Sequence, residues 1–302
     1  MNEENSYNYL NELFNKAFEK NAFGFICSIL RIRGMSDANW EPFDESRKAF
    51  EDYNWLLHKS EEENKSFCTL RIGLLMYCQA VEMSAPHEIL ANILRCINNQ
   101  THIHDPFESI KRRKKDFSYS PPSAKSKFSK IKELADQINE GELKNLIDSF
   151  FDDKIRNAFI HSDYILTDSY FRYTEGQPAQ QIELKTIQNK INNCIIYYSS
   201  FMKLHRDWLF KLAHLKKYHK WPNYEVLELL SSKEEGLYGF NVHFSNGSKA
   251  TYSRRSSGVE AINIFFEKDG QLNFMSGSFE DLESIWKING QPVDDWEEFN
   301  RK

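Results

Sequence analysis

The sequence lacks the features that mark several large classes of protein. Its five cysteines are scattered along the chain without a CxxC pair, so neither a disulfide framework nor a zinc site is expected. No apolar run approaches the roughly 18 residues that a membrane span needs. The amino terminus is rich in Asn and Glu and has no basic start followed by an apolar stretch. We therefore expect no secretory signal and predict a cytoplasmic protein.

Motifs for several common chemistries are also absent. No GxGxxG, GxxxxGK[ST], GxSxG or HExxH occurs, so dinucleotide redox, nucleotide hydrolysis and serine-hydrolase chemistry lack support. His102 and His104 lie close together in Thr-His-Ile-His-Asp, but no distant third ligand accompanies them. Such a pair is more typical of a loop than of a metal site. We predict neither a metal nor a cofactor.

What the chain does contain is a globular composition with an uneven charge distribution. It has 302 residues, 40% of them hydrophobic and 14% aromatic, which is enough for two domains and a core. The formal net charge is only −5, yet nine Lys or Arg residues and one acid lie between positions 111 and 132. Such a block attracts polyanions, although a solvated surface is the alternative. The basic block predicted to contact RNA consists of Lys111, Arg112, Arg113, Lys114 and Lys115.

Hydrophobic periodicity predicts helices as far as about residue 218. Apolar residues recur at helical spacing over 9–18, 50–57, 70–83, 86–97, 128–138 and 143–150, and again over a long stretch from 185 to 216. The prolines and serines of 98–123 indicate a loop, after which Ser123 or Ser126 is a candidate helix cap. Strand-like segments at 170–173 and 181–184 predict a small hairpin inserted between helices.

The composition changes after about residue 223. Alternating apolar residues over 238–244 lead to Asn246-Gly247, a strong signal for a tight hairpin, and 250–252 supplies the return strand. A second pair, 261–266 and 272–275, is joined through Asp269-Gly270, and Ser278 and Asp281 then open a short helix. We predict a mainly α fold: a helical segment over 1–40, a helical bundle over 41–220 with the inserted hairpin, and a small β-rich (α+β) domain over 224–302.

The most informative segment is Lys154-Ile155-Arg156-Asn157-Ala158-Phe159-Ile160-His161, which we expect on a short helix that starts at Asp152-Asp153. Arg156 offers a permanently charged planar fork for a phosphate, and His161 is a side chain that exchanges protons near neutral pH. Asn157 and His161 are spaced i,i+4 and share one side of a helix, which the long Arg156 side chain must sweep round to join. This grouping suits cleavage of a phosphodiester without a metal.

The Arg-Asn-x-x-x-His segment, followed by Ser162-Asp163-Tyr164, resembles the signature of HEPN domains, and the resemblance extends over the helical part from about 40 to 218. It implies a HEPN-like helical bundle that cuts RNA without a metal and leaves 2′,3′-cyclic phosphate ends. It also implies a homodimer, because one chain supplies only one histidine. Arg156 would bind the scissile phosphate, His161 would act as general acid or base, and Asn157 would orient the phosphate or the partner's histidine.

The same resemblance implies a toxin or phage-defence setting, with an antitoxin or defence-system protein as a further partner. Two alternatives remain open. The first is a non-catalytic sensor or adaptor that binds nucleic acid or nucleotide through a HEPN-like bundle. In the second, Arg156 and His161 pair with acids such as Asp152, Asp163 or Asp168 and have only a structural role.

Overall fold

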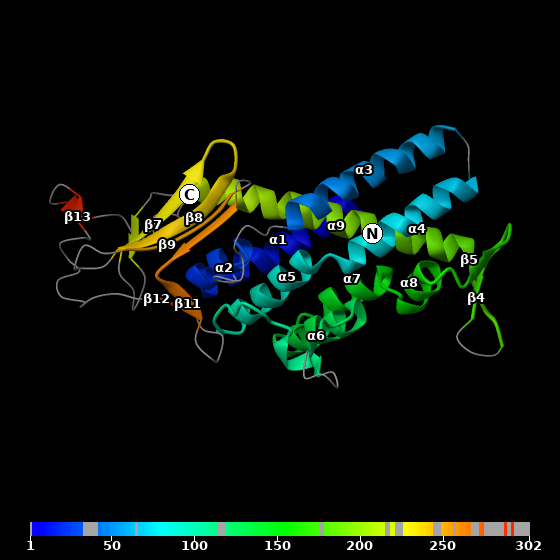
Figure 1. Ribbon diagram of the computed structural model, residues 1–302, viewed down its shortest axis with the longest axis horizontal. Helices are drawn as coiled ribbons and strands as arrows, with labels where there is room; N and C mark the ends of the chain where they lie inside the picture. The colour runs from blue at the N-terminus through cyan, green and yellow to red at the C-terminus, as the bar shows by residue number, and fades with distance from the viewer. Residues whose placement is uncertain are drawn as a thin grey trace. The chain divides into compact units, whose positions relative to one another are not determined.

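The computed structural model describes residues 2–32, 42–63, 66–113, 119–174, 178–214, 218–220, 226–243, 249–255, 258–266, 272–274, 287–288 and 291–292. Within these ranges the chain is mostly helical up to Ala213 and then forms antiparallel strands (Figure 1). The predicted mainly α layout with β structure near the carboxyl end is therefore confirmed. The helix expected from Ser278 and Asp281 lies outside the described residues.

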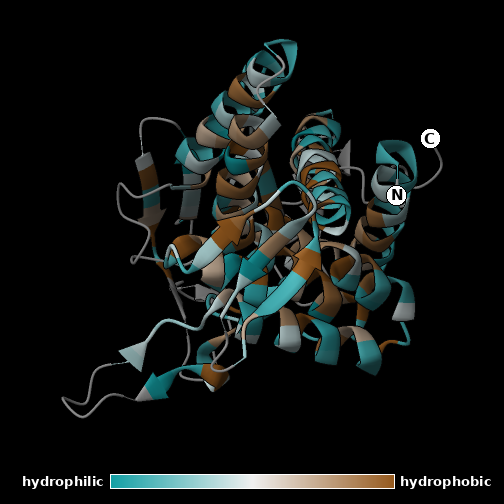
Figure 2. Cartoon of the chain, turned by 90° about the vertical axis from the view of Figure 1, so that its right-hand side faces the viewer, coloured by the Kyte–Doolittle hydropathy of each residue, from teal (hydrophilic) through white to brown (hydrophobic). Residues whose placement is uncertain are grey.

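Nine α-helices and one 3-10 turn occur in the described part of the chain. The helices are α1 (Glu3–Lys20), α2 (Ala22–Ile29), α3 (Pro42–Glu62), α4 (Ser66–Glu82), α5 (Ser84–Ile97), α6 (Ala124–Gln137), α7 (Gly141–Phe150), α8 (Asp153–Ile160) and α9 (Leu184–Ala213), and the turn is η2 (Glu108–Ile110). Ser123 caps α6 by accepting a hydrogen bond from the backbone of Ser126, which confirms one of the two predicted caps. Figure 2 shows hydrophobic and hydrophilic residues alternating around the helices. No described helix is both long and apolar enough to span a membrane.

Short antiparallel strands fill the connections between helices. They are β1 (Arg112–Arg113), β2 (Tyr119–Ser120), β3 (Tyr164–Leu166), β4 (Tyr170–Tyr173) and β5 (Gln180–Glu183). β1 pairs with β2, and β3, β4 and β5 form a three-stranded sheet in that order. The predicted insertion between α8 and α9 is confirmed, but it contains one strand, β3, that the sequence pattern did not identify. The Tyr164 ring on β3 stacks on Phe171 with 5.1 Å between centroids and lies 5.4 Å from the Phe159 ring on α8.

The carboxyl-terminal strands are β6 (Tyr218–Lys220), β7 (Val226–Ser232), β8 (Gly236–His243), β9 (Lys249–Arg255), β10 (Gly258–Ile262), β11 (Ile264–Phe266), β12 (Leu272–Phe274), β13 (Lys287–Ile288) and β14 (Gln291–Pro292). Five of them form an antiparallel sheet in the order β10-β9-β8-β7-β6, and β11-β12 and β13-β14 are separate pairs. Pairing of β8 with β9 and of β11 with β12 confirms both predicted hairpins. Gly236 opens β8 with φ +72°, where a Cβ would lie 2.9 Å from the Leu209 backbone.

The chain divides into two compact units. The first comprises 1–13, 42–94 and 107–202, and the second comprises 14–41, 95–106 and 203–302. The division falls inside α1, α5 and α9 and also between residues 41 and 42 and between 106 and 107, so it meets the predicted break near 40 but has no boundary near 220. Those breaks stay predictions about independently folding segments.

Each unit has an aromatic core. In the first, Phe150 stacks on Tyr197 with 4.8 Å between ring centroids and lies edge-on to Phe128. In the second, Trp208 contacts Phe25 at 4.7 Å between centroids. All five rings are nearly inaccessible to solvent. Burial of such large apolar rings favours folding, and in the first unit it packs α6, α7 and α9 together.

Candidate functional site

The helix that carries the predicted site is defined at both ends by local chemistry. Asp152 caps α8, since its Oδ1 accepts hydrogen bonds from the backbone N–H groups of Lys154 (3.0 Å) and Ile155 (3.4 Å). The helix ends at His161, the C-cap, and Ser162 follows with φ +60°. Ile155 and Ala158 are buried, and α8 packs against α4. The helix start predicted at Asp152-Asp153 is confirmed.

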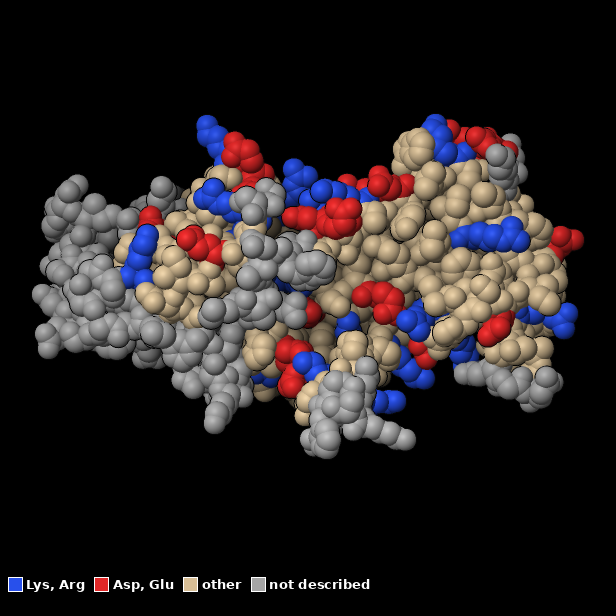
Figure 3. All heavy atoms as spheres, viewed as in Figure 1, with Lys and Arg blue, Asp and Glu red and all other residues tan. Residues whose placement is uncertain are grey.

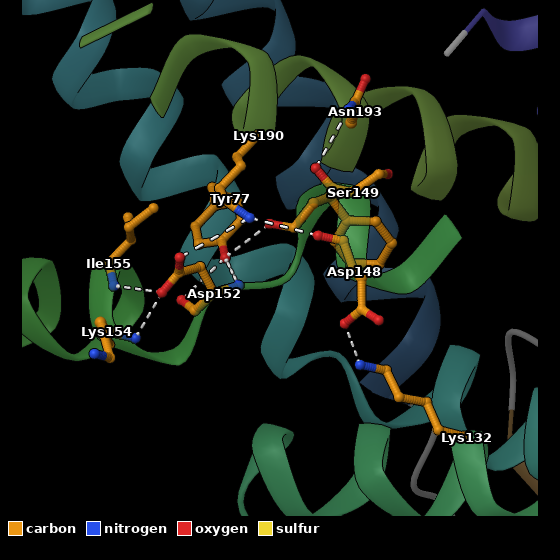
Figure 4. Close-up of polar contacts among 10 residues, drawn as sticks. Tyr77, Lys132, Asp148, Ser149, Asp152, Lys154, Ile155, Lys190 and Asn193 are labelled. Carbon is orange, nitrogen blue, oxygen red and sulfur yellow. Dashed lines mark hydrogen bonds and ion pairs between the residues drawn. The ribbon is translucent and has the colours of Figure 1, made fainter. Parts of the chain in front are cut away.

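A polar network around the α7–α8 junction fixes where α8 begins (Figure 4). The buried Tyr77 hydroxyl on α4 lies 3.2 Å from the carbonyl oxygens of Phe150 and Asp152, and it accepts the Asp152 N–H at 2.8 Å. Lys190 on α9 lies 3.9 Å from the Asp152 carboxylate. Because these contacts reach α4, α7, α8 and α9, the position of His161 depends on the packing of four helices.

Asn157 and His161 line one small pocket, as their i,i+4 spacing predicts. The pocket has a volume of about 140 Å³, and its wall is completed by Lys154 and Ala158 on α8, by Tyr173 on β4, and by Asp163 and Thr174, which flank the strands β3 and β4. His161 is exposed, whereas Asn157 is half-buried. The pocket therefore combines an accessible imidazole, an amide and an ammonium group, which can donate hydrogen bonds to phosphate oxygens, with a carboxylate, which can accept a proton.

Arg156 contacts Asn157 but is also held by an acid on another helix. Its Nη1 donates to Asn157 Oδ1 at 2.6 Å, and its Nη2 lies 2.6 Å from Glu82 Oε1 at the end of α4. The Arg156 side chain is 23% exposed, and its Nε is buried with no hydrogen-bond partner among the described residues. The structure thus brings Arg156 to Asn157, as expected, while Glu82 neutralises part of its charge.

Cys78 lies beneath this pair on α4. Its Sγ is 3.9 Å from the Arg156 carbonyl oxygen, and burial raises its pKa to about 12, an effect that Arg156 opposes and Glu82 adds to. A thiol with this pKa stays protonated near neutral pH and is a poor nucleophile. Cys78 is therefore a packing residue of the site.

The basic block is only partly described. Lys111 pairs with Glu108 one helical turn earlier, and Arg112 is exposed on β1. For Arg113 only the backbone, paired with Tyr119, is described. Lys114 and Lys115 lie outside the described residues. On the face shown in Figure 3, Lys and Arg side chains are interspersed with Asp and Glu among the described residues. RNA binding by Lys111 to Lys115 stays a prediction.

Of the two histidines in the Thr-His-Ile-His-Asp segment, His102 has the environment of a structural residue. His102 is buried, with its Nε2 2.9 Å from the Ile32 carbonyl oxygen and its Nδ1 3.3 Å from the Ser28 hydroxyl. Burial lowers its pKa to about 4 although the Ile32 contact opposes this shift. No group of three or more His, Cys, Asp and Glu residues that could hold a metal ion occurs in the part of the chain that is described.

Two residues of the site, Glu82 and Lys154, are not predicted from the sequence. Glu82 precedes Arg156 by 74 positions, so no local pattern links them, and the acids expected as partners for Arg156 were Asp152, Asp163 and Asp168. Lys154 lies within the motif segment but was not assigned a role. Its spacing supplies a signal that was available, because Lys154, Asn157 and His161 follow one another at i, i+3 and i+7 on one helix face.

Comparisons with protein-family models, with curated proteins and with solved structures found no match to this chain.

Proposed function

We propose that the chain is a HEPN-like, metal-independent endoribonuclease, with Arg156, Asn157 and His161 as its catalytic residues. One observation carries the proposal: the three motif side chains are contiguous, since Arg156 donates to Asn157 and Asn157 shares a pocket with the exposed His161. Lys154 adds a cation to the same wall, where it would attract a phosphate.

The reaction divides into proton transfers and charge stabilisation. A base removes the proton of the RNA 2′-hydroxyl, and the 2′-oxygen then forms a bond to phosphorus as the bond to the 5′-oxygen breaks. An acid protonates the departing 5′-oxygen, so the products are a 2′,3′-cyclic phosphate and a 5′-hydroxyl. Arg156 stabilises the added negative charge on the phosphorane, and Asn157 orients Arg156 or the phosphate. His161 is either the acid or the base.

A second copy of the chain would supply the missing histidine. Ile160 and Ile165, which flank His161 in the sequence, are 49% and 63% exposed, so apolar surface adjoins the motif and would be covered by a partner. We expect a homodimer in solution and a monomer after Ile165→Lys, with molar mass from light scattering as the measurement. A wild-type monomer would remove the second histidine from the mechanism. The toxin or phage-defence setting, with an antitoxin or defence-system partner, rests on the resemblance alone.

The cleavage test uses total RNA and transfer RNA in EDTA, with identification of the product ends. We expect the wild type to leave cyclic phosphate, and His161→Ala and Arg156→Ala to be inactive. His58→Ala is the matched control, since His58 is also an exposed histidine but lies on α3 beside Glu61. Equal cutting by all four proteins would place the activity at another site or in a contaminant.

One observation favours a second candidate, a non-catalytic nucleic-acid or nucleotide-binding sensor or adaptor. Glu82 already occupies Nη2 of Arg156, so less of its charge is available to a phosphate. Under this alternative, RNA stays intact with every variant, while RNA binding is retained by the wild type. Binding without cleavage, measured by fluorescence anisotropy in the same buffer, separates the two functions.

A further inference from the structure

A larger pocket lies at the opposite end of the β3-β4-β5 sheet from His161. Its volume is about 540 Å³, within the range of sites for small molecules, and it is lined by residues from four elements and the β3–β4 turn. Those that matter for its chemistry are Phe67 at the start of α4, Asp168 in the β3–β4 turn, Tyr170 on β4, Glu183 at the end of β5 and Lys185 at the start of α9. Nothing in the proposed cleavage uses them.

The pocket presents aromatic rings beside two carboxylates that accept hydrogen bonds, and the Lys185 ammonium group adds a donor that could meet a phosphate. Phe67 and Tyr170 are each 36% exposed, so part of each aromatic ring is accessible to a ligand in the pocket. Tyr170 lies directly opposite Glu183 in the β4–β5 register, so the ring and the carboxylate leave the same face of the sheet side by side. Asp168 supplies a second exposed carboxylate next to them.

This combination selects a planar ligand that donates hydrogen bonds. Aromatic side chains stack on any nucleobase, whereas a carboxylate accepts hydrogen bonds only from amino and ring N–H groups. Guanine presents an amino group and a ring N–H next to each other, and one carboxylate can accept from both. Uracil offers a single N–H between two carbonyl oxygens, and a carboxylate repels those oxygens.

The pocket also lies near the His161 site along a single strand. Tyr173 lines the smaller pocket and Tyr170 the larger one, three residues apart on β4 or about 10 Å at the rise of a strand. Arg172 lies between them on the face of Tyr170 and is exposed, so it offers a charge to a phosphate. The side chains of Tyr170 and Tyr173 lie on opposite faces of the sheet. A strand of RNA that reaches both pockets would therefore pass across the end of the sheet.

We propose that the pocket of Phe67, Asp168, Tyr170 and Glu183 binds a guanine base, stacked on Tyr170 and read by the Glu183 carboxylate. The inference rests on the proposed function for its source, which is a nucleotide of the RNA strand near the phosphate held at His161. A free guanine nucleotide carries the same base, and the two sources are separated by experiment.

The test measures binding by fluorescence anisotropy, using full-length protein with His161→Ala so that the RNA stays intact. The probes are a short oligouridylate that carries one guanosine and the same oligomer without it. We expect the guanosine oligomer to bind about tenfold more tightly, the scale of one stacked and hydrogen-bonded base. Tyr170→Ala and Glu183→Gln should each abolish the preference, whereas Tyr170→Phe should keep it. Trp55→Ala is the control, because Trp55 is an exposed aromatic residue of α3 outside the pocket.

Competition with guanosine monophosphate distinguishes the sources. If the mononucleotide displaces the oligomer at concentrations similar to the oligomer's own Kd, the pocket serves a free nucleotide; displacement only at far higher concentrations indicates the RNA strand. Equal affinity for the two oligomers, or an equal loss with Trp55→Ala, overturns the guanine site. The result is independent of the cleavage assay: absence of cleavage with a guanine preference removes the nuclease and keeps the pocket, and cleavage without a preference does the reverse.

Discussion

His161 and His87 belong to the same compact unit but occupy opposite environments. His161 ends α8 and is exposed in a pocket with Asn157. His87, on α5, is buried against Phe128 with 4.6 Å between ring centroids, and its Nε2 lies 3.3 Å from the Tyr198 hydroxyl. Burial, with a smaller contribution from Lys127, lowers the His87 pKa to about 3. The comparison teaches that surroundings decide whether a histidine is available for proton transfer or is a neutral part of the core.

The largest expected effect is on cleavage. His161→Ala should lower the rate about 10²- to 10⁴-fold, the usual contribution of a general acid or base, and should change the free energy of unfolding by less than about 0.5 kcal/mol because the side chain is exposed. His87→Ala should instead lower the free energy of unfolding, because it leaves a cavity in the core, and should have little direct effect on the cleavage rate. RNA cleavage and urea unfolding of both variants give the result. Strong destabilisation by His161→Ala would mean that its role is structural.

The pH dependence of stability sharpens the same comparison. His87 has a pKa of about 3 in the folded protein and an ordinary value of 6.5 when unfolded, so only the unfolded state binds its proton between these values. The contribution of neutral His87 to stability is therefore complete above about pH 6.5 and is lost as the pH falls toward 3. By pH 5 the loss amounts to about 2 kcal/mol. His102 acts in the same direction, since burial lowers its pKa to about 4.

Urea unfolding near pH 7 and pH 5 measures this loss. His87→Gln keeps a polar side chain that does not titrate, so the decrease in stability between the two pH values should become smaller by about 2 kcal/mol. His161→Ala, which removes an exposed imidazole, is the control. If His87→Gln and the wild type lose the same stability on acidification, the buried histidine does not bind a proton on unfolding in this range.

The sequence predicts local features of this molecule well and long-range ones poorly. Asp152 and Ser123 act through residues two to three positions away, so their caps were visible as short patterns. The Arg156–Glu82 pair was not, because it depends on how α4 packs against α8. β3 is three residues long, too short for an alternation of apolar and polar residues to show. The guanine pocket likewise exists only through the meeting of α4, β4, β5 and α9.

Asp152 tests whether the exposed histidine depends on its helix start. Asp152→Ala removes the side chain that caps α8 and should cost about 1 to 2 kcal/mol of stability, whereas Asp152→Asn keeps an acceptor and should cost only a few tenths. Cleavage should fall with Asp152→Ala, since a frayed first turn shifts Lys154 and Arg156. Hydrogen exchange of the α8 amides checks this directly. Unchanged protection in Asp152→Ala would show that packing alone fixes the helix.

The smallest expected effect concerns the charge pair beside the pocket. Glu82 and Arg156 are 39% and 23% exposed, so water screens their attraction, and a double-mutant cycle of Glu82→Ala and Arg156→Ala should give a coupling of about 0.5 to 1 kcal/mol in stability. A coupling near zero would contradict a formed ion pair. Removing the carboxylate also leaves the Arg156 charge unneutralised beside Asn157. In the non-cleaving His161→Ala protein, Glu82→Gln should therefore strengthen RNA binding, whereas no change would mean that the phosphate does not meet Arg156.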